Sequence, residues 1–214
     1  NNIEKSFTKD HMLIKSEIDV DADFYNTNLK KSNYQNTSRF FPSVALTASY
    51  PTVKFKNNKS ILLEPITKVI YTLNNNKEEK IVNEDSLEVE LLSSNFLTKN
   101  KYSGDDRKEH GLRINYGVNL RFRGEDGSSD SFTIGRSYYQ KKQEKFDKLS
   151  GFKNKHSDLV GNYTSYFSNN SIFYYDFRLA NNFTLNRNRL RANLFIEDNI
   201  LKLNYTQIKN FASR

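Results

Sequence analysis

Hydrophobic and polar residues alternate without interruption between residues 112 and 123. The even positions from Leu112 to Phe122 are all aliphatic or aromatic, whereas the odd positions from Arg113 to Arg123 are Arg, Asn or Gly. Side chains leave a β-strand alternately on its two faces. A period of two therefore predicts a strand with one apolar and one polar face.

The same alternation recurs along the chain, most clearly at 17–24, 44–50, 63–73, 173–179 and 201–205. Turn-rich stretches such as RGEDGSSD at 123–130 separate about ten such segments. We therefore expect an all-β fold, an antiparallel meander of about ten long strands. Pro65 lies inside one segment, and because proline lacks a backbone donor we expect a bulge or a strand start there.

Strand length helps to separate two architectures that share this pattern. Twelve residues at about 3.4 Å each span about 40 Å, and a strand of this length tilted by about 45° crosses the apolar part of an outer membrane. In a soluble sandwich the apolar faces pack together as a core. In a transmembrane barrel the apolar faces meet lipid and the polar faces line a wet lumen. The long segments favour part of a large transmembrane β-barrel.

Aromatic content and charge refine this picture. The chain contains 13 Tyr and 16 Phe, spread along its length, which indicates an ordered protein despite a mean hydropathy of -0.79. No apolar run reaches about 18 residues, which argues against a helical membrane protein, and the first residues lack the apolar centre of a signal peptide. Cysteine is absent, so thiolate metal sites are excluded. The formal net charge of +8 favours a polyanionic partner such as anionic lipid, phosphorylated glycolipid or nucleic acid.

Five stretches, taken in order and with their spacing, resemble one bacterial family. They are RFFPSVALTASYP (39–51), LLEPITKVIY (62–71), NEDSLEVELLSSNFLTKNKYSGDDRKEHGLRINYGVNLRF (83–122), IGRSYY (134–139) and SDLVGNY (157–163). Together they resemble the lipopolysaccharide-assembly protein LptD, also called organic solvent tolerance protein or OstA. The most specific parts are 83–86, 95–97 and 103–107. Asp105, Arg136 and the order of Phe96 and Leu97 depart from the family's usual residues.

This resemblance implies a protein of the bacterial cell outer membrane that transports lipopolysaccharide into the outer leaflet, with no covalent chemistry, no cofactor and no nucleic-acid partner. It also implies a barrel of about 26 strands in contact with outer-membrane lipids. A lipoprotein plug like LptE and a periplasmic bridge like LptA, reached through an amino-terminal domain, would be its protein partners. We expect residues 1–214 to be a single segment of the carboxy-terminal barrel domain, a fragment that lacks the periplasmic domain and the gate strands.

A charged loop carries the most specific part of the resemblance. The resemblance suggests that Asp106 and Arg107 form a bidentate carboxylate–guanidinium pair and that Gly104 permits the turn. The side chains of residues 83–86 would cap turns at the barrel rim. The alternative is a solvated hairpin tip, because Gly and Asp are ordinary turn residues. No catalytic role is expected, and the structural loop motif comprises Asn83, Glu84, Asp85, Ser86, Asn95, Gly104, Asp106 and Arg107.

Basic residues on the polar faces of the strands form a second candidate site. If these faces line a lumen, their side chains can meet the phosphates of lipid A through several weak contacts. The alternative is that the polar faces simply carry charge, which an acidic strand face at Glu17, Asp19, Asp21 and Asp23 balances. The basic residues concerned are Arg113, Arg121, Arg123, Lys68 and Arg178.

Other chemistries find little support in the sequence. His11, His110 and His156 lack the spacing of metal ligands. A nucleophile elbow, a phosphate-binding loop and a dinucleotide fingerprint are all absent. Two other functions stay open. One is a small self-contained outer-membrane porin or adhesin barrel, and the other is a soluble β-sandwich that binds carbohydrate or nucleic acid.

Overall fold

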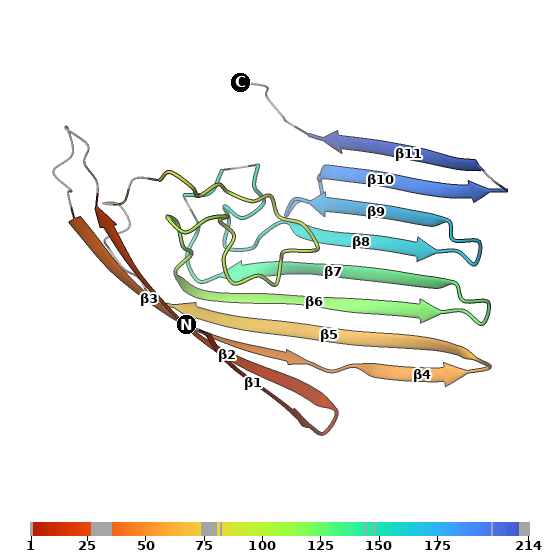
Figure 1. The fold of residues 1–214 in the computed structure, drawn as a ribbon, viewed down its shortest axis with the longest axis horizontal. Helices are drawn as coiled ribbons and strands as arrows, with labels where there is room; N and C mark the ends of the chain where they lie inside the picture. The colour runs from red at the N-terminus through yellow and green to blue at the C-terminus, as the bar shows by residue number, and fades with distance from the viewer. Residues whose placement is uncertain are drawn as a thin grey trace.

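The described part of the chain forms one antiparallel sheet in a computed structural model, which describes residues 2–26, 36–73, 81, 83–143, 145–147, 149–197 and 199–209. Its eleven strands are β1 (Asn2–Lys9), β2 (Met12–Asn26), β3 (Asn36–Ser49), β4 (Thr52–Lys56), β5 (Lys59–Thr72), β6 (Gly111–Arg123), β7 (Ser129–Tyr139), β8 (Leu159–Tyr166), β9 (Ile172–Leu179), β10 (Leu185–Ile196) and β11 (Asn199–Ile208). They follow each other in the sheet in chain order, except that β4 continues the path of β3 along β5. The predicted meander is confirmed (Figure 1). Within the described residues, no helix is long and apolar enough to cross a membrane.

Pro65 lies inside β5 without interrupting it, so the predicted bulge or strand start is wrong. It pairs with Val118 of β6 in a register that continues on both sides without a shift. Its carbonyl oxygen accepts a hydrogen bond from the amide of Tyr50 at 3.1 Å, on the side away from β6. The nitrogen and carbonyl of one residue point to the same side of an antiparallel strand. The missing N–H therefore falls at the corner between β3 and β4, and the ladder with β6 loses no donor.

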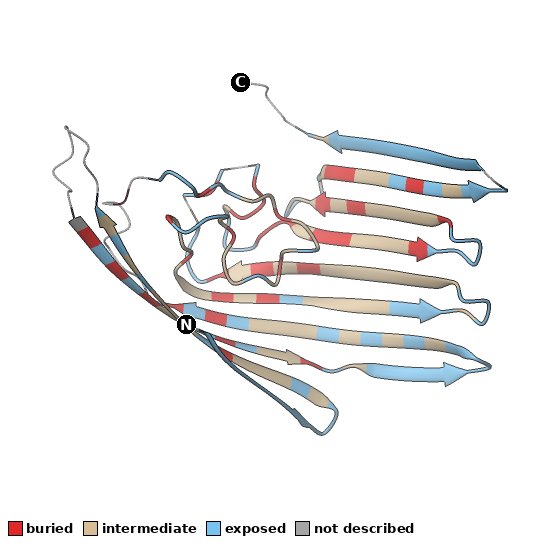
Figure 2. Ribbon diagram, viewed as in Figure 1, coloured by how far each residue is buried: buried red, intermediate tan, exposed pale blue. Residues whose placement is uncertain are grey.

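Burial on the two faces of the sheet is the reverse of that in a soluble protein. Large apolar side chains such as Ile18, Leu46 and Leu203 are exposed on one face. On the opposite face the buried side chains include charged ones, with Glu17 at 5% and Arg113 at 2% relative exposure. Figure 2 shows that many buried residues lie in the strand ends next to the long loops, whereas the hairpin ends of β4–β6 are largely exposed. A β-sandwich would cover its apolar face with a second sheet. Because the described residues form a single sheet with that face open, the sandwich alternative does not fit.

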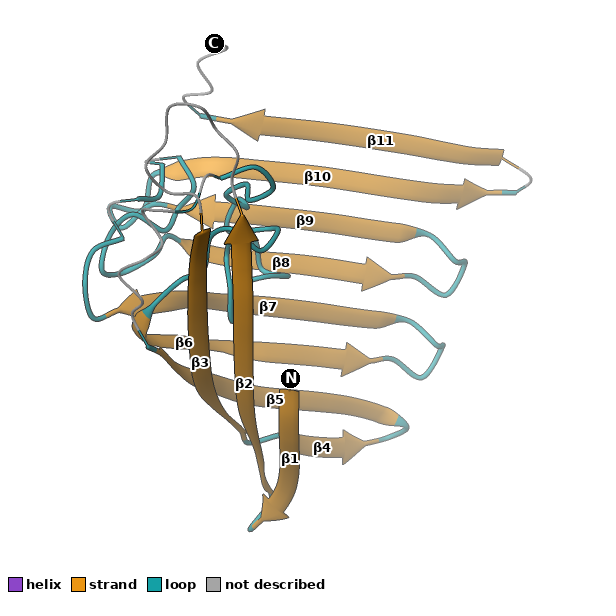
Figure 3. Cartoon of the chain, turned by 60° about the vertical axis from the view of Figure 1, so that its left-hand side comes forward, coloured by secondary structure: helices purple, strands orange, loops and turns teal. Residues whose placement is uncertain are grey.

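The connections at the two ends of the sheet differ in length. At one end, tight hairpins join β1 to β2, β4 to β5, β6 to β7, β8 to β9 and β10 to β11. At the other end, long segments lie between β5 and β6 and between β7 and β8. The described parts of these segments gather where the sheet bends, and β1–β3 run there at a steep angle to β6–β11 (Figures 1 and 3). This bend creates the site.

Candidate functional site

Residues 83–109 form a strap across the polar face of the sheet. Ion pairs connect the strap to Asp19 of β2 on one side and to Arg187 of β10 on the other. The strap contains all eight residues of the predicted loop motif. The structure therefore brings this motif together in one element that is held against the sheet.

Two aspartates tie the ends of the strap to each other. The Asp85 carboxylate accepts hydrogen bonds from the amides of Asp105 at 2.9 Å and Asp106 at 3.0 Å. In return, the Asp106 carboxylate accepts from the amides of Glu84 at 2.7 Å and Asp85 at 3.1 Å. Hydrogen bonds stabilise an ionised carboxylate. The bonds from the amides of Asp105 and Asp106 are the main reason that the pKa of Asp85 falls to about 2.

Two capping side chains complete these reciprocal contacts of Asp85 and Asp106, which we call the pin. The Asn83 side chain accepts a hydrogen bond from the amide of Ser86 at 3.0 Å and donates one to its carbonyl at 2.8 Å. Ser86 Oγ donates to Asp85 at 2.9 Å and accepts from the amide of Arg107 at 2.9 Å. Ser86 and Asp106 are buried, which does not fit a solvated hairpin tip. The bidentate pair between Asp106 and Arg107 stays a prediction.

Gly104 is required by the backbone of this pin. Its φ of +77° lies in the left-handed region, which side chains disfavour. A Cβ atom at this position would lie 2.6 Å from the carbonyl oxygen of Asp85. Glycine is therefore the residue that this turn accommodates without strain.

Arg39 of β3 holds the pin against the sheet, and sequence reasoning missed it. Its guanidinium donates to the carbonyl oxygen of Asp106 at 2.6 Å and to that of Asp105. On its other side it donates to Asp23 at 2.7 Å and to the hydroxyl of Tyr25 at 2.9 Å. In the sequence, Arg39 stands out only because it lies on the polar face of its strand next to two phenylalanines.

An aromatic anchor fixes the middle of the strap to β6 and β7. Gly117 and Gly135 face each other across these strands. A Cβ atom on Gly135 would come within 2.4 Å of the Phe96 ring, and one on Gly117 within 2.9 Å of it. The ring thus packs directly on the backbone of both glycines, in space that a side chain at either position would fill. Phe96 belongs to a buried cluster that joins the strap to the sheet and to the segment before β8, with Leu91, Tyr139, Phe146, Phe152 and Val160.

Asn95 shapes the turn that presents Phe96. Its side-chain oxygen accepts from the amide of Leu92 at 2.9 Å, and its side-chain nitrogen donates to the carbonyl of Glu90 at 2.8 Å. The main-chain amide of Thr98 donates to the Asn95 carbonyl at 3.1 Å. An asparagine that bonds its neighbouring backbone in this way stabilises a turn without regular secondary structure.

Lys101 is a buried cation inside the strap. Its Nζ donates to the carbonyl oxygens of Thr98 at 2.6 Å and Phe96 at 3.2 Å. Burial lowers the pKa of Lys101 to about 8, and the charge of Glu109 opposes this effect. Nothing in the spacing of the sequence distinguished this lysine from the exposed ones.

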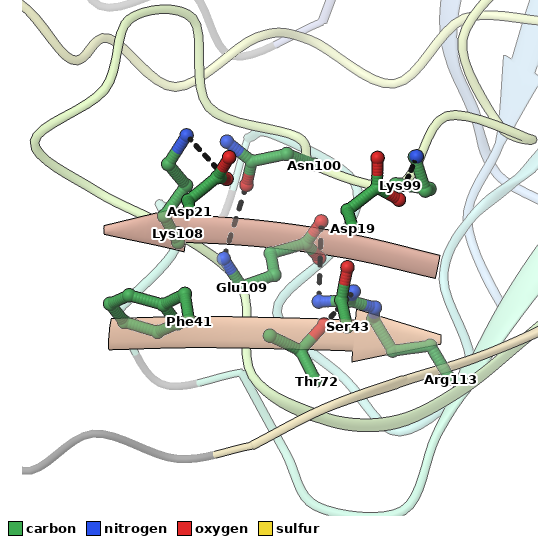
Figure 4. A pocket seen from close by; sticks show the side chains of 10 residues that line it. All are labelled: Asp19, Asp21, Phe41, Ser43, Thr72, Lys99, Asn100, Lys108, Glu109 and Arg113. Carbon is green, nitrogen blue, oxygen red and sulfur yellow. Dashed lines mark hydrogen bonds and ion pairs between the residues drawn. The ribbon is translucent and has the colours of Figure 1, made fainter. Parts of the chain in front are cut away.

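Ion pairs connect the strap to the acidic face of β2. Lys99 pairs with Asp19, and Lys108 lies 3.4 Å from Asp21 (Figure 4). Glu17, the next acid on this face, is 2.6 Å from Lys68 of β5. The ion pairs of the acidic face therefore include strap lysines, Lys68 and Arg39.

A cavity of about 140 Å³, lined mainly by polar and charged residues, lies beneath these ion pairs. The strap closes one side of it, and β2, β3, β5 and β6 supply the rest (Figure 4). Arg113 donates to Thr72 at 3.0 Å within its wall. The ten lining residues are Asp19, Asp21, Phe41, Ser43, Thr72, Lys99, Asn100, Lys108, Glu109 and Arg113.

On its opposite side the strap reaches β9 and β10. The Glu90 carboxylate lies 3.0 Å from Arg178 and pairs also with Arg187. Asp158 and Asp176 stand behind these arginines at 3.5 Å and 3.6 Å. Each guanidinium thus faces carboxylates from two directions, which fixes its orientation.

The structure divides the five predicted basic residues into two groups. Arg113 and Arg178 are each 2% exposed, and Lys68 pairs with Glu17 of β2. These three side chains support the strap or the wall around it. Arg121 and Arg123 lie on the same polar face but are exposed, at the hairpin end of β6 beyond the strap. Among the described residues, no group of three or more His, Asp or Glu side chains could hold a metal ion.

Comparison with known families identifies the chain. A family model described as "LptD: LPS transport system D" matches residues 1–214. The chain belongs to the LptD family. A search of curated proteins found no match. Membership places the chain in the outer membrane and in lipopolysaccharide transport, as the resemblance implied. The outward apolar face and the all-β sheet agree with an outer-membrane LptD barrel.

Proposed function

We propose that this LptD chain forms a section of barrel wall along whose polar inner face lipopolysaccharide moves before it is inserted into the outer leaflet. The observation that carries the proposal is the inverted burial of the sheet, with exposed aliphatic side chains outside and buried charges inside. A wet, charged lumen lowers the barrier for the polar head of an amphiphile without any covalent step.

Further strands would complete the barrel. Among the described residues, β1 pairs only with β2 and β11 only with β10. Two open edges are unfavourable in lipid, because unpaired backbone groups find no water there. We infer that residues 1–214 are one segment of a larger barrel, with an LptE-like lipoprotein as lumenal plug and an LptA-like bridge as periplasmic donor.

The lengths of the connections support one orientation. Outer-membrane barrels have short periplasmic turns and long outer loops. The tight hairpins, including that between β6 and β7, would then face the periplasm, and the strap would lie toward the outside. Arg121 and Arg123 stand at the hairpin end, where lipopolysaccharide from the periplasmic bridge would enter. Their guanidinium groups suit lipid A phosphates.

The alternation of inward-facing and outward-facing residues along β6 provides the test. A photo-crosslinking amino acid is placed at position 121, 122 or 123 of the full-length protein in cells. Arg121 and Arg123 face inward, whereas Phe122 is the matched control on the lipid-facing side of the same strand. We expect lipopolysaccharide adducts at 121 and 123 and none at 122. Adducts at 122 alone, or at no position, would contradict passage along this face.

A further inference from the structure

The edge of the strap at β2 and β3 and the edge at β6 to β10 contact the sheet through different chemistry, although Glu90 adds ion pairs with Arg178 and Arg187 at the latter edge. At β6 and β7, the Phe96 ring lies on two glycines and continues into a buried apolar cluster. At β2 and β3, the contacts are ion pairs of Lys99 and Lys108 and the hydrogen bonds of Arg39. Salt screens ion pairs near solvent, whereas it does not weaken apolar burial. The two edges therefore differ in how easily they separate.

The cavity lies under the ion-paired edge and has the properties of a water site. Buried Glu109 and Arg113 both line it, and Glu109 Oε1, Arg113 Nε and Arg113 Nη1 have no hydrogen-bond partner within the described part of the chain. Its charged lining is balanced, because Asp19, Asp21 and Glu109 oppose Lys99, Lys108 and Arg113. A neutral, polar space of about 140 Å³ has room for several water molecules, each of which takes about 30 Å³ in the liquid.

We propose that the strap is a lid that stays fixed at its aromatic edge and parts from β2 and β3 at its ion-paired edge, above a water-filled cavity. Water already present can solvate Lys99 and Lys108 as they leave their carboxylates, so the main cost at this edge is the loss of the Arg39 hydrogen bonds to two strap carbonyl oxygens. Lifting the other edge would expose the Phe96 cluster, which is costly. Opening uncovers Thr72 and Arg113 to the lumen and creates a polar path along β5 and β6.

Two thiol probes distinguish the edges. The chain contains no cysteine, so a single thiol can be introduced. Thr72 lines the cavity and is 5% exposed, whereas Ser137 is fully buried beside the carbonyl of Phe96. In the full-length protein, with any cysteines elsewhere replaced, Thr72→Cys or Ser137→Cys is alkylated with a small maleimide. Raising the salt from about 0.01 M to about 1 M shortens the screening length from about 30 Å to about 3 Å.

We expect salt to accelerate alkylation at position 72 about tenfold and to leave position 137 unchanged. The double substitution Lys99→Gln with Lys108→Gln should reproduce this effect at low salt. Lys141→Gln with Lys142→Gln removes the same charge from exposed positions and serves as the matched control.

Because Thr72→Cys alters the acceptor of the Arg113 hydrogen bond, Ser43→Cys supplies a second probe of the same cavity. Equal acceleration at 72 and 137 would mean that the strap moves as a whole. No acceleration at either 72 or 43 would mean that the strap is fixed. Both outcomes overturn the proposal. Alkylation is measured without transport, so a failure of the proposed function would be recognised separately.

Discussion

The contact between Phe96 and two facing glycines allows a quantitative test of how the strap is anchored. The three atoms nearest to a Cβ atom on Gly135 would all belong to the Phe96 ring, at 2.4–2.8 Å. One on Gly117 would meet the main-chain oxygen of Ile134 at 2.4 Å and the ring at 2.9 Å. Neither glycine has a positive φ, so alanine at either position is opposed by packing and not by backbone strain. Removing the ring should rescue alanine at 135 more fully than at 117.

The expected energies follow from these contacts. Phe96→Ala removes a fully buried ring and should cost about 3–5 kcal/mol of unfolding free energy. Gly135→Ala overpacks the same place and should cost about 1–3 kcal/mol. In the double variant the new methyl group occupies space vacated by the ring, so the combined loss should fall short of the sum by about 1–3 kcal/mol. For Gly117→Ala the clash with the Ile134 carbonyl remains after the ring is removed, so the shortfall should be smaller than for Gly135→Ala.

Urea unfolding of the refolded full-length protein in detergent micelles measures these free energies, with the slope of the transition as a check that the unfolding reaction is unchanged. The cycle with Gly117→Ala is the matched control, because both glycines lie under the same ring. An equal interaction energy for both glycines, or none for Gly135, would refute the idea that Phe96 packs specifically against residue 135.

Three further predictions concern the strap. Asp85→Asn should loosen the pin at neutral pH. The folded-state pKa of Asp85 is lowered to about 2, so the wild type should lose the stability that this carboxylate provides as the pH falls from about 4 to 2. The variant lacks the carboxylate and should not show this loss. Proteolysis of the strap at different pH values measures the difference. Lys101→Met should abolish a rise in wild-type stability of up to about 3 kcal/mol between pH 8 and about 10.4 in urea titrations. The sign follows because the unfolded lysine binds a proton that the buried one has lost. Arg39→Lys keeps the charge but loses the fork that holds two carbonyls, and should cost about 1.5–3 kcal/mol.

A specific result would contradict each of these predictions. Parallel acid profiles of wild type and Asp85→Asn would exclude a special role for that carboxylate. A rise above pH 8 that persists in Lys101→Met would assign the effect to other groups. If Arg39→Lys matches the wild type in urea, positive charge alone holds the pin.

Much of the sheet could be read from the sequence because strand periodicity is local. The alternation from Leu112 to Arg123 predicted a strand and both of its faces, and β6 has them. Family motifs predicted the loop residues that meet in the strap, including the glycine at 104. Pro65 misled the prediction, because its effect depends on which side of β5 its nitrogen faces, and that is set by the corner between β3 and β4.

The sequence by itself determined the strands, the separation of apolar from charged faces and the family, since each depends on residue order alone. Only the tertiary structure decided which charges meet. Arg39 lies 66 residues from Asp105 and Lys99 lies 80 residues from Asp19, and each pair forms because the sheet bends and the strap crosses the bend. The same bend buries Arg113 and Arg178 and leaves Arg121 and Arg123 open. These four arginines lie on the polar face of the sheet, and their burial depends on whether the strap reaches them.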